Sequence, residues 1–219
     1  MICLSQPANK AASNAFIITR MVEKFHIQPR ELNADLSNDF FNRLLKQLDE
    51  ERIYFNKEDI TRLSAYRFRF DEEIKQKKTD FLKLITAIYT TRLHQADTMI
   101  DVIAKKPFNF SATEKFTLTE DTSYPADIGS MHNKLYKKLK LAVLNDLLDF
   151  NDDLSEKDQN KRKRLLDSAQ TTFQKKAISE YKRNITGILQ SPGSVDQFIA
   201  DEYCKALASC YDPHTEFLH

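Results

Sequence analysis

Residues 165–189, LLDSAQTTFQKKAISEYKRNITGIL, decide the fold class of this chain. Apolar side chains recur at nearly every fourth position, a spacing that places them along one face of an α-helix. The residues of this face are Leu165, Ala169, Phe173, Ala177, Tyr181, Ile185 and Leu189. The pattern predicts a long helix that packs this face inward and ends at Ser191-Pro192-Gly193, where proline and glycine break helical geometry.

The same spacing on both sides of this stretch predicts seven helical segments in total. The third puts Ile60, Leu63, Arg67, Phe70 and Ile74 on one stripe of a single helix. The other expected bounds are a first helix from about Ser13 to before Pro29, a second capped by Ser37, the third capped by Asn56, a fourth from Thr79, a fifth capped by Ser130, and a last one from Ser194 to before Pro213. Residues 194–197 have the capping-box form S-x-x-Q, and residues 151–163 form a polar connector or helix start.

Residues 105–127 interrupt the helical pattern. They contain Pro107, Pro125 and many threonines, and residues 116–119 alternate between apolar and polar side chains. Such alternation is typical of a strand, so a short β-hairpin is an open alternative within an otherwise irregular loop. The predicted fold class is therefore all-α: a multi-helix, bundle-like domain with one long irregular loop.

Charge and composition give no global signal for nucleic acid or a membrane surface, and only local patches stay open as sites for such partners. The 219 residues carry 33 Lys+Arg and 32 Asp+Glu, which leaves a net charge of +1 and no global attraction to nucleic acid or an anionic membrane. The basic run at residues 161–164 follows several acidic residues, so a solvated helix face is expected there. No apolar run reaches the roughly 18 residues of a transmembrane helix.

Glycine, histidine, cysteine and serine occur in this chain, but their spacing does not match the motifs of common enzymes or metal sites. Only three glycines occur, and no phosphate-binding loop or G-x-S-x-G turn is formed by them. The five histidines and three cysteines have no metal-ligand spacing. The serines favour helix caps over nucleophiles, at Ser13, Ser37, Ser130, Ser155 and Ser194. We therefore predict no catalytic residue, cofactor site or metal site in this chain, and a mainly core role for its aromatic residues.

The last helical run ends in YDPHTEFLH, residues 211–219. Proline disfavours helical geometry at the residue before it, and apolar side chains follow the break, as expected at the entrance to another domain. The stretch resembles the Asp-Pro-His-Thr-x-Tyr-Leu segment of tail-specific proteases, also called C-terminal processing peptidases. The residues that carry this resemblance, which we take as a candidate domain junction, are Asp212, Pro213, His214, Thr215, Phe217 and Leu218.

Further segments are similar to the same family in the same order. Residues 48–60, LDEERIYFNKEDI, fit its pattern Leu-Asp-x-x-Arg-x-Tyr-Phe-x-x-x-Asp-Ile. Residues 108–110, Phe-Asn-Phe, resemble its Phe-Asp-Phe segment, and Tyr124-Pro125 stands where the family often has Trp-Pro. The resemblance covers roughly residues 30–218, and it divides the chain into an N-terminal segment with one helix, 1–29, and a helical domain, 30–219.

The resemblance implies an N-terminal helical domain that precedes a PDZ domain and a serine-lysine catalytic core. It implies a periplasmic or exported location, substrates with apolar C-termini, and contacts with the protein's own PDZ and catalytic domains and with an adaptor protein. No segment here matches the family's nucleophile turn, so no catalytic residue is transferred. His214 is open to two interpretations: a contact at the boundary with the protease core, or satisfaction of backbone groups at a helix end.

Two other functions stay open at this point. One is a free-standing helical adaptor or scaffold without protease activity, and the other is an enzyme that depends on a metal or a base not recognised in the sequence. The coding frame beyond residue 219 distinguishes the first of these from a protease domain, because only a protease continues into a PDZ domain and a catalytic core.

Overall fold

The computed structural model describes residues 6–25, 30–111, 123–155 and 158–211, and in these ranges every regular element is an α-helix. The all-α prediction is confirmed. The helices are α1 Gln6–Phe25, α2 Ala34–Leu48, α3 Lys57–Ser64, α4 Phe70–Lys75, α5 Asp80–Ala104, α6 Ile128–Asp153, α7 Gln159–Leu189 and α8 Ser194–Tyr211.

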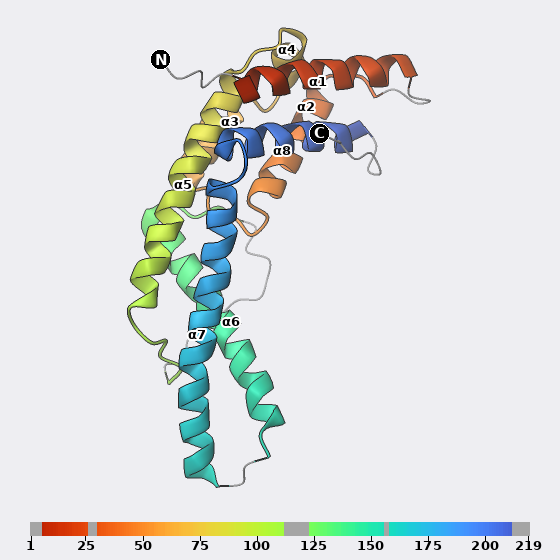
Figure 1. The fold of residues 1–219 in the computed structure, drawn as a ribbon. Coiled ribbons are helices and arrows are strands. Elements are labelled where there is room, and N and C mark those ends of the chain that lie inside the picture. The colour runs from red at the N-terminus through yellow and green to blue at the C-terminus, as the bar shows by residue number, and fades with distance from the viewer. Residues whose placement is uncertain (1–5, 26–29, 112–122, 156–157, 212–219) are drawn as a thin grey trace.

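The helices form a body at one end and a projecting hairpin at the other (Figure 1). α1, α2, α4 and α8 gather in the body, and the long helices α5 and α7 run away from it. The C-terminal half of α6 and the N-terminal half of α7 extend beyond α5 as an antiparallel pair, which we call the arm. One cluster of buried apolar side chains connects α1 with α8 and continues along α5, α6 and α7.

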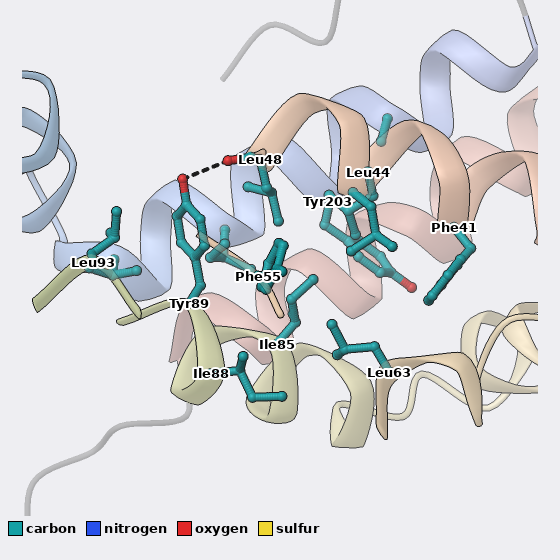
Figure 2. Packing of buried hydrophobic residues seen from close by; sticks show 14 of the residues in the cluster. Phe41, Leu44, Leu48, Phe55, Leu63, Ile85, Ile88, Tyr89, Leu93 and Tyr203 are labelled. Atoms are coloured by element: carbon teal, nitrogen blue, oxygen red, sulfur yellow. Dashed lines mark hydrogen bonds between the residues drawn. The ribbon is translucent and has the colours of Figure 1, made fainter. Parts of the chain in front are cut away.

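Aromatic rings fill the middle of the body. Phe70 lies edge-on to Phe40 and to Phe81, with ring centroids 4.7 Å apart in both pairs, and Tyr203 of α8 lies edge-on to Phe40 at 4.8 Å. This geometry is favourable because ring edges are positive and ring faces are negative. Figure 2 shows the neighbouring part of the core, where the Tyr89 hydroxyl of α5 donates to the Leu48 carbonyl at the end of α2, at 2.9 Å.

The start of the second helix differs from the prediction, and the start of the third agrees with it. α2 is capped by Asn33, whose side-chain oxygen accepts from the amides of Asp35 and Leu36; Ser37 lies inside the helix and is buried. Asn56 caps α3 in a reciprocal capping box with Asp59. The first helix begins at Gln6, ahead of the predicted Ser13.

The predicted third helix is two helices. α3 ends at Ser64, and tight turns close the chain between it and α4, with the amides of Tyr66 and Arg67 donating to Leu63 and Ser64 at 3.1 Å. Arg67 therefore leaves the apolar stripe and lies over the Phe41 ring at 4.9 Å. Leu63 and the α4 residues Phe70 and Ile74 are buried as predicted. The break is what allows the Phe70 ring to enter the aromatic cluster.

Carboxylates cap the two arm helices, where serines were predicted. Asp127 accepts from the Ser130 amide at 2.7 Å and caps α6, and Asp158 caps α7, while Ser155 is exposed and outside any helix. Both helices extend into the predicted polar connector at 151–163. The exposed Lys161, Lys163 and Arg164 fit the predicted solvated face.

The start of α8 and the outer part of α7 differ in detail from the sequence pattern. α8 does begin at Ser194, but no capping box forms there, because the Gln197 side chain bonds Asp201 at 2.7 Å. Leu165, predicted to face inward, is 41% exposed because it lies in the arm, where α7 has few neighbours. The hairpin predicted at residues 116–119 lies outside the described residues, and residues 105–111 and 123–127 are irregular apart from short turns.

Candidate domain-junction site

The candidate junction residues, Asp212, Pro213, His214, Thr215, Phe217 and Leu218, lie outside the described residues. The described part of the chain leads to them through the last turn of α8, which ends at Tyr211. The contacts of this last turn therefore determine where the chain enters the junction.

The first set of contacts comes from α1, which lies alongside α8 and runs in the same direction (Figure 1). The Tyr211 hydroxyl donates to Thr19 Oγ1 at 3.4 Å, and the Cys204 thiol, earlier on the same helix, is 3.8 Å from the Ala11 carbonyl. The α1 side chains on this face are small, since Ala11, Ala12 and Ala15 are all buried. Small side chains allow the backbones of α1 and α8 to approach closely. Contacts with α1 therefore hold α8 from Cys204 to its last residue, Tyr211.

The second set comes from Arg30, which lies between α1 and α2 in sequence. Its Nη1 donates to the Cys210 carbonyl at 3.4 Å, and its Nη2 donates to Asp39 of α2 at 2.5 Å. A cation at a helix C-terminus satisfies a free carbonyl and complements the helix dipole. The ion pair is partly exposed, so its main effect is to position the Arg30 side chain. Arg30 was not predicted from the sequence, because no local pattern marks a contact between residues 180 positions apart.

The residues that carry the family resemblance at 48–60 form a connector between α2 and α3, organised by Asp49. This carboxylate is 3% exposed and accepts from the amides of Ile53 at 2.7 Å, Tyr54 at 3.0 Å and Phe55 at 2.9 Å. Burial raises the pKa of Asp49 to about 6, against the opposing effect of these three hydrogen bonds and of Lys134. Asp49 therefore fixes the backbone of the connector.

The connector in turn joins distant parts of the chain. The Lys57 amide donates to the Pro125 carbonyl at 2.9 Å, and the Arg52 guanidinium lies over the Tyr124 ring at 5.2 Å. Glu51 pairs with Lys138 of α6 and accepts from the Tyr181 hydroxyl of α7 at 3.5 Å. The segments singled out by resemblance at 48–60 and 124–125 thus meet at one place, beside Tyr181 of α7.

Aromatic residues in irregular segments are expected either to pack against their own loop or to contact a partner domain, and the described ones pack internally. Phe55 is fully buried against Tyr89, with centroids 5.6 Å apart, and Phe108 is buried against Tyr136 at 5.3 Å. Tyr54, Phe110 and Tyr124 are partly buried against the core. Phe116 lies outside the described residues.

Two glutamines of α7 hold the start of the long loop. Gln174 donates to the Lys106 carbonyl at 2.8 Å and accepts from the Phe108 amide at 3.2 Å, while Gln170 donates to the Phe108 carbonyl at 2.7 Å. These side chains replace the backbone partners that a strand or helix would supply. The signal was visible in the sequence only as two polar residues beside the apolar stripe of α7.

A buried ion pair joins α3 to α5. Two guanidinium nitrogens, Arg92 Nε and Nη2, donate to Asp59 at 2.7 and 2.8 Å, and Asp59 also accepts from the Asn56 amide. The hydrogen bonds to Asp59 raise the pKa of Arg92. This bidentate geometry makes Asp59 both a helix cap and a contact between helices.

The two cysteines of the described region, Cys204 and Cys210, are free thiols buried in α8. Burial raises the pKa of the Cys204 thiol to about 12 and that of the Cys210 thiol to about 11, so both stay protonated at neutral pH. Within the described ranges, no group of three or more His, Cys, Asp or Glu side chains is placed to hold a metal ion. None of the described helices combines the length and the apolar character needed to cross a membrane.

These observations define a class of protein: a helical domain whose buried polar side chains brace its loops, and whose last helix is fixed just before a candidate junction. The chain belongs to the family of tail-specific protease N-terminal domains, since the family model described as "Tail specific protease N-terminal domain" matches residues 18–219. The match includes all the segments that carry the resemblance. A comparison with curated proteins found no match.

Proposed function

We propose that this chain is the noncatalytic N-terminal helical domain of a periplasmic C-terminal processing serine endopeptidase. In this role residues 30–219 frame the protease core, preceded by the N-terminal segment 1–29, and the domain binds an adaptor or limits the entry of substrates with apolar C-termini. The family match supports the domain assignment. The serine and lysine that cleave the peptide bond belong to a following core.

The observation that carries the proposal is the fixed end of α8. Tyr211 and Cys210 are held by Thr19 and Arg30 immediately before the candidate junction. A domain that frames a core must transmit its position through the connecting chain, and a frayed last turn would not do so. The bracing of α8 by two elements far away in sequence is the arrangement that such a role requires.

The experiment compares the 219-residue chain with the full-length protein on a peptide that has an apolar C-terminus. We expect the purified chain to show no turnover and the full-length protein to cleave. In the full-length protein, Arg30→Ala is expected to lower turnover several-fold by loosening the end of α8. Arg20→Ala is the matched control, because Arg20 pairs with the neighbouring Glu23 on the exposed surface of α1.

Two results would contradict the proposal. Turnover by the fully purified chain that depends on one of its own residues would identify an enzyme in these helices. A stop codon directly after residue 219, with no PDZ domain or catalytic core encoded, would favour the alternative of a free-standing helical adaptor or scaffold. The projecting arm, with exposed leucines on α6, is the feature that favours this alternative.

A further inference from the structure

The outer face of α6 carries a stripe of leucines that is largely uncovered in the described structure, since Leu144 and Leu148 are exposed and Leu141 is partly buried. Leu141, Leu144 and Leu148 form the apolar middle of the stripe, and the charged residues Lys137 and Asp152 lie at its two ends. On a helix of 3.6 residues per turn these positions fall within a band about 80° wide. The band lies opposite the buried face of α6, which is formed by Met131, Leu135, Leu139 and Val143. Leu144 is 36% exposed and Leu148 is 52% exposed.

The two charges at the ends of the stripe have no partner within the described chain. Lys137 and Asp152 are exposed and form no ion pair with any described residue. Along α6 they are about 22 Å apart, too far to pair with each other. No opposite charge stands three or four residues from either of them on the helix. Asp152 also lies near the C-terminal end of α6, where the helix dipole disfavours a carboxylate and the last turn contains no basic residue.

The order of residues along the stripe is self-complementary. Positions 137 and 152 lie at equal distances from a point between residues 144 and 145, and so do positions 141 and 148. If a second α6 is laid antiparallel on the first, with a twofold axis at this point, Lys137 faces Asp152 of the second copy. Leu141 then faces Leu148 of the second copy, and Leu144 lies beside the axis. A twofold interface requires this kind of symmetry, because the same surface must fit itself.

We propose that the outer face of α6 is a homodimer interface, formed by antiparallel pairing of this stripe with the stripe of a second copy. The pairing buries six leucines and forms two symmetric ion pairs at the rim. Three leucines from each copy form a small apolar contact compared with the interfaces of stable dimers, so we expect a weak dimer whose population depends on protein concentration. The inference stands on α6 alone and does not depend on the proposed function.

The test uses charge reversal in the complete 219-residue chain, with association measured by sedimentation equilibrium over a wide range of concentration. Lys137→Asp places two carboxylates opposite each other at both ends, and Asp152→Lys places two ammonium groups there. Each single variant is expected to weaken the dimer by about tenfold, because rim pairs are lost and like charges are introduced. The double variant, Lys137→Asp with Asp152→Lys, restores both pairs and is expected to dimerise as the wild type does.

A mixture of the two single variants gives the sharpest result. All interface charges of one variant are then acidic and those of the other are basic, so the mixture is expected to form a one-to-one heterodimer although neither variant associates well alone. Asp149→Lys and Lys163→Asp are matched controls, because both positions are exposed in the arm and lie off the stripe. Circular dichroism before sedimentation confirms that each variant is folded.

The proposal is overturned if the wild-type chain stays monomeric at all concentrations, which would leave the stripe to another partner. It is equally overturned if the single variants dimerise as strongly as the wild type, or if neither the double variant nor the mixture recovers association. Leu148→Asp supplies an independent measurement, since it introduces a charge in the apolar middle of the stripe and is expected to abolish the dimer.

Discussion

Replacing Asp49 tests whether one carboxylate holds the connector between α2 and α3. In Asp49→Ala the amides of Ile53, Tyr54 and Phe55 lose their acceptor, and two of these amides are buried. A buried amide without a partner costs about 1–3 kcal/mol. Removing the buried charge offsets part of this loss, so we expect a decrease of about 3 kcal/mol in the free energy of unfolding at pH 7. The melting temperature is then expected to fall by about 6–12 °C.

Asp49→Asn separates hydrogen bonding from charge. Its single amide oxygen can take the place of the carboxylate oxygen that accepts from Tyr54 and Phe55, which leaves the Ile53 amide unpaired. We expect about half the effect of the alanine variant. Both variants are measured by urea denaturation, with Asp167→Ala on the exposed face of α7 as the control, for which a change below about 0.5 kcal/mol is expected.

The dependence on pH gives a second measurement of the same residue. The pKa of Asp49 is about 6 in the folded protein and 3.8 as its ordinary value, so the folded state binds the proton more tightly. The contribution of Asp49 to stability therefore rises as the pH falls from 7 to 4, by up to about 3 kcal/mol, and is lost as the pH rises through 6. The asparagine variant lacks this change. An alanine variant within about 1 kcal/mol of the wild type at pH 7 would refute the role assigned to Asp49.

Two substitutions and one labelling experiment test other buried contacts. Arg92→Met leaves the carboxylate of Asp59 buried without its ion-pair partner, and we expect a loss of about 3 kcal/mol of unfolding free energy in urea denaturation. Gln174→Leu removes the hydrogen-bond partners of the Lys106 carbonyl and the Phe108 amide, and it is expected to cost about 2 kcal/mol and to accelerate hydrogen exchange at the Phe108 amide. The Cys204 thiol, buried and protonated, is expected to react with a thiol reagent only after unfolding, as followed by absorbance.

Control variants at exposed positions accompany the two substitutions, and a background variant accompanies the thiol labelling. Arg62→Met is the control for Arg92, since Arg62 is exposed on α3, and equal effects of the two changes would deny a special role to the ion pair. For Gln174 the control is the exposed Lys175→Leu, and unchanged exchange at Phe108 would show that the loop start is held by other contacts. Thiol labelling is done in a Cys3→Ser background, and rapid labelling of the folded chain would contradict the burial of α8.

Local patterns predicted most of the fold. The long apolar stripes of α5 and α7 predicted helices, because an apolar period near four residues matches the turn of a helix and not the alternation of a strand. The Asn56 cap was also predicted, since the cap and its acidic partner lie within four residues of each other. Ser37 was a wrong choice because Asn33, four residues earlier, caps the true start of α2, and asparagine and serine are about equally good caps, so residue type alone does not choose between them.

The candidate site was predicted less completely, for a physical reason. Its residues act through contacts between segments far apart in the chain, as between Arg30 and Cys210 or between Gln174 and Phe108. A polar residue looks the same in a sequence whether it faces water or a backbone group of a distant loop. The break between α3 and α4 is similar, because the position of Phe70 is set by Phe40 and Phe81 rather than by its neighbours in sequence.

The length of α7 has a mechanical consequence. Its 31 residues run without interruption from the tip of the arm to the body, and over about 46 Å such a helix behaves as a stiff rod. Near its inner end Lys182 bonds Asp101 at 2.5 Å and Tyr181 bonds Glu51 of the connector, so the rod is clamped at these points. A force on the tip of the arm is therefore transmitted along α7 to the connector between α2 and α3 and to α8.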